Sequence, residues 1–149
     1  MNIYDSTDTN DLIVQINKLT PATKPNWGKM SLDQMLTHLN VVYLMAFTDK
    51  DTPPNSVAKF LLKLIIKKGV VVPKPNPKNG RTEPQFIIKN AKNFDEEKKK
   101  LISYIEKVRD SGNSNFEGKE SQSFDPLTAE EWNVLFAKHM EHHLTQFGV

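Results

Sequence analysis

The sequence predicts an all-α protein in which residues 1–149 form a single four-helix-bundle domain. Three observations favour this class. Four substantial segments repeat their apolar residues with the 3.6-residue period of an amphipathic helix. Two of these segments begin with the paired side chains of a capping box. No segment alternates apolar and polar residues well enough to require a sheet, and only residues 70–72 and 86–88 form short β-like runs.

The first helix is expected to start at Thr9 or Asn10 and to stop before Pro21, because apolar residues recur there at helical spacing. The preceding residues form a polar lead-in. Residues 21–29 contain two prolines and a glycine and are predicted to form a loop. Trp27 in this loop is expected to pack over the end of the bundle, and the alternative is that its ring walls a pocket.

The second helix is predicted to begin at Ser31, with Gln34 completing a capping box. Its apolar face extends over residues 32–47 with a strongly helical period. His38 lies about 100° from the centre of that face. We therefore expect His38 on the shoulder of the helix, where its side chain can lean into a cleft between helices.

A short extra helix and a long irregular loop are predicted between the second and third long helices. Residues 56–68 form the short helix, with a solvated stripe of lysines on one face; the alternative is a basic helix that lies on a membrane surface. Residues 69–93 form the longest irregular stretch, which includes Lys74, Lys78 and Arg81. These cations are expected to be solvated, and the alternative is that they meet an anionic substrate.

The third long helix is predicted to open at residues 94–97, where three acidic side chains complement the helix dipole. Its apolar stripe continues to residues 110–112. Residues 112–125 are polar and rich in turn formers, so we expect them to form a surface connection to the last helix.

The last helix contains the residues with the clearest chemical meaning. Thr128 and Glu131 form a capping box at its start, and Gly148 suits the left-handed turn that ends a helix. His139 and His143 are four residues apart, so both rings project from its apolar face. Neutral imidazole is the commonest metal ligand in proteins, and such a pair can fill two positions of a tetrahedral site.

His38 can supply a third ligand if the second and last helices run antiparallel. It lies about 10 Å from the start of its helix, and the pair His139 and His143 lies about 9 Å from the end of the last one. All three rings would then sit at nearly the same level. Three histidines with an open fourth position are typical of catalytic zinc sites, and nickel or iron would accept the same ligands. The alternative is that the histidines are packed core residues.

Composition excludes several other classes of site. The chain has no cysteine, which rules out disulfides, thiolate metal sites and a cysteine nucleophile. A net charge of +2 is too small to indicate nucleic-acid binding. No apolar run approaches the roughly 20 residues of a membrane span. The acidic start lacks the features of a signal peptide, so a cytoplasmic protein is expected.

Two stretches resemble the DinB/YfiT superfamily and, within it, a branch of uncharacterised bacterial proteins. They read MSLDQMLTHL over residues 30–39, and PLTAEEW with KHMEHHLTQFG over residues 126–132 and 138–148. The resemblance implies a four-helix bundle that holds a divalent metal through His38, His139 and His143. It also implies homodimers, for which the apolar residues 60–66 are the expected face.

Superfamily members with assigned chemistry include metal-dependent thiol transferases and a thiol-dependent isomerase. One departure is that relatives often carry a His-Pro pair where Ser121 and Gln122 stand here. The predicted function is a metal-dependent enzyme acting on small molecules, by thiol-S-transfer or hydrolysis. A thiol nucleophile would have to come from a low-molecular-weight cosubstrate. Candidates for a general base, by proximity to the motifs, are Asp33, Glu141 and His142.

Two other functions fit the same residues. In one, the bundle binds a metal or an apolar ligand without turnover. In the other, it is an interaction module whose histidines only pack in the core. Metal content separates the interaction module from the other two functions, and turnover separates the enzyme from the binding protein.

Overall fold

The computed structural model describes residues 1–47, 69, 71, 72, 74–79, 88, 90, 92–121 and 126–149. These residues form four α-helices and one short 3-10 helix: α1 (Ser6–Lys18), α2 (Leu32–Met45), α5 (Phe94–Ser111), η3 (Asn113–Asn115) and α6 (Ala129–Gln146). The same residues contain no strand, so the prediction of an all-α fold is confirmed for this part of the chain. The predicted short helix over 56–68, its dimer face over 60–66, Arg81 and Gln122 lie outside the described residues.

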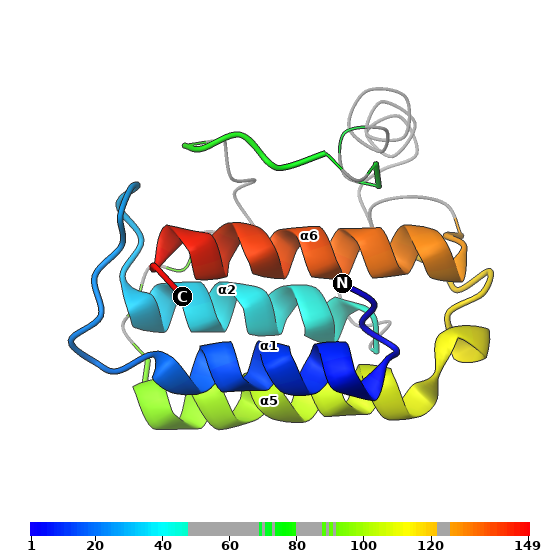
Figure 1. Cartoon of the computed structure of the whole chain (residues 1–149), viewed down its shortest axis with the longest axis horizontal. Coiled ribbons are helices and arrows are strands. Elements are labelled where there is room, and N and C mark those ends of the chain that lie inside the picture. The colour runs from blue at the N-terminus through cyan, green and yellow to red at the C-terminus, as the bar shows by residue number, and fades with distance from the viewer. Residues whose placement is uncertain are drawn as a thin grey trace.

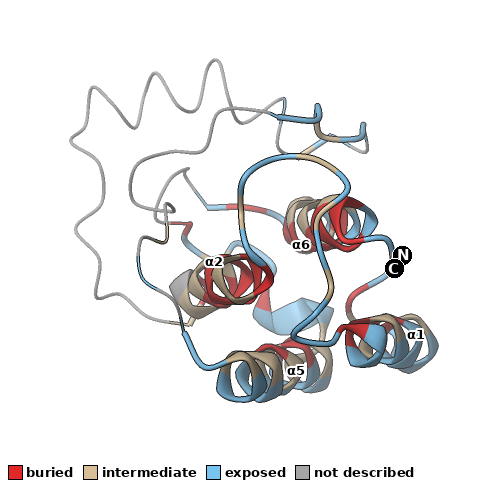
Figure 2. Cartoon of the chain, turned by 90° about the vertical axis from the view of Figure 1, so that its left-hand side faces the viewer, coloured by how far each residue is buried: buried red, intermediate tan, exposed pale blue. Residues whose placement is uncertain are grey.

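The four α-helices lie side by side in one bundle (Figure 1). α1 and α6 run in one direction, and α2 and α5 run in the other. Seen from the end, α2 packs between α5 and α6, and α1 lies diagonally opposite α2 (Figure 2). The buried faces of all four helices point toward the centre. α2 and α6 are therefore antiparallel neighbours, as the proposed meeting of the histidines requires.

α1 begins earlier than the sequence predicted, at Ser6 instead of Thr9 or Asn10. Asp5 is its N-cap, and the Asp5 carboxylate accepts hydrogen bonds from the backbone N–H groups of Thr7 and Asp8 at 2.8 and 3.1 Å. This first turn is polar, so hydrophobic periodicity does not reveal it. The end at Lys18 agrees with the prediction of a stop before Pro21.

The predicted starts of the other described helices are confirmed, whereas α2 ends at Met45, before the end of its predicted apolar face at residue 47. Gln34 accepts a hydrogen bond from the Ser31 backbone N–H at 2.9 Å, at the start of α2. At the start of α6, Thr128 and Glu131 satisfy each other's backbone donors at 3.0 and 3.2 Å. Gly148 has φ +78°, the left-handed conformation expected just after the helix.

The prediction for residues 112–125 is wrong at Phe116. They were expected to be a surface connection, yet Phe116 is only 1% exposed and belongs to the core. Its ring centroid lies 5.6 Å from that of Tyr4, 5.9 Å from that of Trp132 and 6.2 Å from that of Phe136. Phe116 thus anchors the first part of this connection in the core.

No helix within the described ranges is both long enough and apolar enough to cross a membrane. The core is continuous across the four α-helices, and its largest fully buried side chains are Tyr43, Phe116, Phe136, Ile3, Leu12, Ile16, Leu19, Met35, Leu36, Leu39, Leu101 and Ile105.

Candidate metal centre

Three histidines from two helices meet inside the bundle. His38 projects from α2, and His139 and His143 project from α6. The Nε2 atom of His139 lies 2.9 Å from Nε2 of His38 and 3.1 Å from Nε2 of His143. All three residues offer a nitrogen within 4.8 Å of the others. The structure therefore brings together the three residues that helix rise predicted at the same height along the bundle.

The cluster is largely shielded from solvent. His38 and His143 are buried, and His139 is partly exposed. His38 was expected to lean from the shoulder of its helix into the space between helices, and it is buried there beside His139. The ring centroids lie 4.8–5.0 Å apart and the rings meet edge to face. Each ring thus packs against the other two while its Nε2 atom points to their common centre.

Burial keeps the imidazoles of His139 and His143 neutral. Desolvation, followed by repulsion from the positive charges that His143 and His38 would carry, holds the pKa of His139 well below its usual 6.5. Burial also lowers the pKa of His143 to about 4. At neutral pH both rings therefore keep an unprotonated nitrogen, which is the form that binds a metal.

The donor set fits a divalent metal. The Nε2 atom of His139 faces two other nitrogens, but a ring nitrogen carries at most one proton, so one hydrogen bond cannot satisfy both contacts well. Zn–N bonds of about 2.0–2.1 Å in a tetrahedral site place ligand nitrogens about 3.3 Å apart. The observed 2.9 and 3.1 Å need only a small outward shift to reach that spacing.

Gln146 orients one of the three rings, and sequence reasoning did not identify it. Its Oε1 atom lies 2.8 Å from Nδ1 of His143, and its Nε2 donates to the Trp27 carbonyl at 2.9 Å. The second bond fixes which side-chain atom is the oxygen, so Nδ1 of His143 is the protonated nitrogen. The lone pair of His143 Nε2 then faces the cluster. The sequence contains one signal for this contact: Gln146 lies three residues after His143, so the two side chains share one face of α6.

A loop holds Gln146 in place from the other side. The Asn26 backbone N–H donates to the Gln146 carbonyl at 2.7 Å. Gly28 adopts φ +83°, and a Cβ atom there would lie 2.8 Å from Nε2 of Gln146. Only glycine suits this position, because it permits both the left-handed backbone and the close approach. The loop and the end of α6 therefore form one supporting unit for His143.

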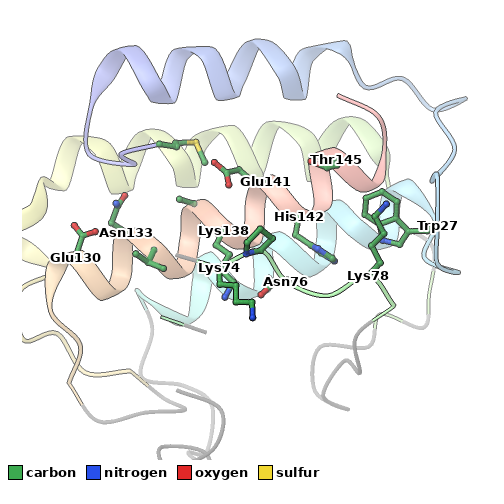
Figure 3. Close-up of a pocket in the computed structure, with 14 residues that line it drawn as sticks. Trp27, Lys74, Asn76, Lys78, Glu130, Asn133, Lys138, Glu141, His142 and Thr145 are labelled. Atoms are coloured by element: carbon green, nitrogen blue, oxygen red, sulfur yellow. The ribbon is translucent and has the colours of Figure 1, made fainter. Parts of the chain in front are cut away.

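The three candidates for a general base lie outside the histidine cluster. Asp33 accepts hydrogen bonds from the Ser31 hydroxyl at 2.6 Å and from the Lys92 backbone N–H at 3.0 Å. These bonds, that of Ser31 first, lower its pKa and tie the start of α2 to the segment before α5. Glu141 is exposed and His142 is partly buried, and both line a cavity on the outer side of α6 (Figure 3).

His142 connects this cavity with the cluster. Its ring centroid lies 5.1 Å from that of His143 and 6.0 Å from that of Trp27. Burial lowers the pKa of His142, and a hydrogen bond to the backbone of Asn76 opposes that effect. His142 therefore packs between the loop and the cluster. Its ring is not among the three that could hold a metal ion.

Comparison with known families adds one finding. The model of a family described as "Protein of unknown function (DUF1569)" matches residues 3–148. The chain belongs to the DUF1569 family. The DUF1569 match includes all three histidines of the cluster and Gln146, and the family description assigns no activity. No curated protein and no solved structure matches the chain significantly.

Proposed function

We propose that this DUF1569 protein binds one divalent metal ion through His38, His139 and His143 and uses it as an enzyme of small-molecule chemistry. The observation that carries the proposal is the convergence of three Nε2 atoms, with separations of 2.9 and 3.1 Å at His139. The resemblance of residues 30–39 and 138–148 to the DinB/YfiT superfamily supports the same metal ligands.

The protein orients the His143 ring and keeps two of the three imidazoles in the neutral form that binds a metal. Gln146 holds His143 with its Nε2 lone pair toward the cluster. The surrounding core keeps His139 and His143 neutral at neutral pH. The ligands are thus already arranged before a metal enters, which lowers the free-energy cost of ordering them on binding.

The proposed reaction is thiol-S-transfer or hydrolysis. A bound divalent ion would act as a Lewis acid and lower the pKa of a water or thiol. Three protein ligands are the number typical of catalytic zinc sites, and imidazole also suits nickel and iron. Because the chain has no cysteine, a reacting thiol would be a separate small molecule.

Elemental analysis tests the metal site. Protein purified without an affinity tag or chelators should contain about one metal ion per chain. His38→Ala and His139→Ala should lose it, whereas His142→Ala should keep it because His142 lies outside the cluster. Wild-type protein that is folded, lacks metal and takes up neither zinc nor nickel would contradict the proposal.

Turnover tests the enzymatic part separately. Metal-loaded protein should catalyse addition of a small thiol to a model electrophile, or hydrolysis of a model ester, and His139→Ala should abolish the activity. Metal binding without turnover of any of these substrates would favour a metal-binding protein over an enzyme.

A further inference from the structure

The cavity on the outer side of α6, which Glu141 and His142 line, is separate from the three-histidine cluster. Its volume is about 440 Å³, and its walls are α6, the Trp27 loop and residues 74–78 (Figure 3). This volume is within the range of small-molecule sites. Two features that the metal site leaves unused, the loop aromatic Trp27 and the basic residues Lys74 and Lys78, meet in this cavity.

The cavity has an apolar floor. Val134 and Ala137 of α6 line it, and both are buried. Lys138 holds the covering chain against the same face, because its ammonium donates to the Gly69 and Val72 carbonyls. Lys138 is therefore already hydrogen-bonded, and the apolar floor stays open to the body of a ligand.

One unsatisfied donor and one cation lie together at one end of the cavity. The Lys78 ammonium lies 4.5 Å from the centroid of the Trp27 ring. The indole N–H of Trp27 is buried and has no hydrogen-bond acceptor in the described structure. In contrast, the indole N–H of Trp132 donates to the Lys119 carbonyl at 3.3 Å. A buried donor without an acceptor is unfavourable, so an acceptor atom bound near it would be stabilised.

The charge of the lining differs between the two ends. Lys74 and Lys78 are exposed cations, and neither forms an ion pair with a described carboxylate. Glu130 and Glu141 also line the cavity. Glu130 lies at the end opposite Trp27 and Lys78 (Figure 3), about 18 Å from His142 along the helix axis at the α-helical rise. Glu141 lies on the solvent-exposed edge.

We propose that this cavity binds a small organic anion. Its carboxylate or phosphate group would lie at the Trp27–Lys78 end, and its apolar body would cover Val134 and Ala137. An anion at this end would gain a charge-assisted hydrogen bond from Lys78, which lies over the Trp27 ring. The proposal does not rest on the metal site, because none of the three clustered histidines lines the cavity.

Nuclear magnetic resonance can follow this site directly. The chain has two tryptophans, so a ¹H–¹⁵N spectrum contains two indole N–H resonances, and Trp27→Phe assigns them. Phenyl phosphate and benzoate should each be titrated, with neutral benzamide as the uncharged counterpart. We expect a saturable shift of the Trp27 resonance with at least one anion, none with benzamide, and no shift of the Trp132 resonance. The anion that binds more tightly identifies the preferred group.

A pair of lysine variants provides the control. Lys78→Ala should weaken binding of the anion about tenfold, because the cation nearest Trp27 is lost. Lys100→Ala should leave affinity unchanged, since Lys100 lies over the Tyr104 ring on α5 at 6.0 Å and does not line the cavity. The absence of a saturable shift with both anions, equal binding of benzamide, or equal effects of the two variants would overturn the proposal.

Discussion

Gln146 and His143 form a hydrogen-bonded pair at the end of α6, with 2.8 Å between Oε1 and Nδ1. The pair matters because it assigns the tautomer of a buried ring. A neutral imidazole with its proton on Nδ1 presents Nε2 as an acceptor, and Nε2 of His143 points to the other two histidines. Partners of this kind commonly set the affinity of a histidine site for its metal.

The first prediction concerns this pair. Gln146→Leu should lower zinc affinity by about 10- to 100-fold, because His143 loses the acceptor that orients its ring. Gln146→Glu should retain most of the affinity, since a carboxylate oxygen can accept from the same Nδ1–H. Isothermal titration with a competing chelator measures both constants.

A measurement on metal-free protein separates this prediction from the metal proposal. Long-range ¹H–¹⁵N spectra should show His143 protonated at Nδ1 in the wild type and in Gln146→Glu, and a mixture of tautomers in Gln146→Leu. If all three proteins gave the same tautomer pattern, Gln146 would not control the ring.

The second prediction is that metal-free protein loses stability on acidification. The folded pKa of His143 is about 4, below the 6.5 of an unfolded chain. Between these values the unfolded state binds more protons, so the free energy of unfolding must fall as pH falls. For His143 alone the decrease from pH 7 to pH 5 is roughly 2 kcal/mol.

Urea unfolding in the presence of a chelator, at several pH values, measures this slope. His143→Asn should show a shallower decrease between pH 7 and pH 5, because it removes one of the groups that the unfolded state protonates. An unchanged slope in that variant would assign the pH dependence to other groups.

Much of the fold was predictable from local signals. The period of the apolar residues located α2, α5 and α6, and the side chains of Ser31, Gln34, Thr128 and Glu131 marked two helix starts. The three histidines could be grouped because helix rise and an antiparallel arrangement set their levels without knowledge of side-chain packing. The helix periods and caps depend on residues close together in the chain, and the grouping of His38 with His139, 101 positions apart, needed only the antiparallel arrangement in addition.

Other features depend on contacts between residues far apart in the sequence, which local patterns do not reveal. Phe116 is a single aromatic among polar residues, so no period marks it as a core residue. Gln146 acts only because Trp27, 119 positions earlier, accepts its second hydrogen bond. The cavity on α6 depends likewise on residues 74–78 lying over that helix.

The third prediction compares two tyrosine hydroxyls. The Tyr43 hydroxyl is buried and lacks a hydrogen-bond partner in the described structure, whereas the Tyr4 hydroxyl donates to the Ala129 carbonyl at 3.0 Å. Tyr43→Phe should therefore raise the free energy of unfolding by about 1 kcal/mol, and Tyr4→Phe should lower it by about 1 kcal/mol. Urea denaturation of both variants checks the signs. Destabilisation by Tyr43→Phe would reveal a partner for its hydroxyl.

The fourth prediction tests the core role of Phe116. Phe116→Ala removes a ring that contacts Tyr4, Trp132 and Phe136, so it should destabilise the protein by about 3–5 kcal/mol. Val14→Ala is a suitable control, because Val14 is 55% exposed on α1 and its change should stay within about 0.5 kcal/mol. Similar denaturation midpoints for the two variants would place Phe116 outside the core.

The last prediction uses two glycines that share a positive φ but not an environment. Gly28 has φ +83° and Gly112 has φ +72°. An alanine at either position is strained by the positive φ, at a cost of roughly 1–3 kcal/mol. A Cβ atom at residue 28 also meets Nε2 of Gln146 at 2.8 Å, whereas a Cβ atom at residue 112 meets nothing within 4 Å.

Gly28→Ala and Gly112→Ala should therefore both lose stability from backbone strain, but only Gly28→Ala should weaken metal binding. Displacing Gln146 releases the ring of His143, so zinc affinity of Gly28→Ala should fall toward that of Gln146→Leu. In the double variant Gly28→Ala with Gln146→Leu, the two losses should not add, because both act through one hydrogen bond. Additive losses would show that the loop acts on the metal site by another route.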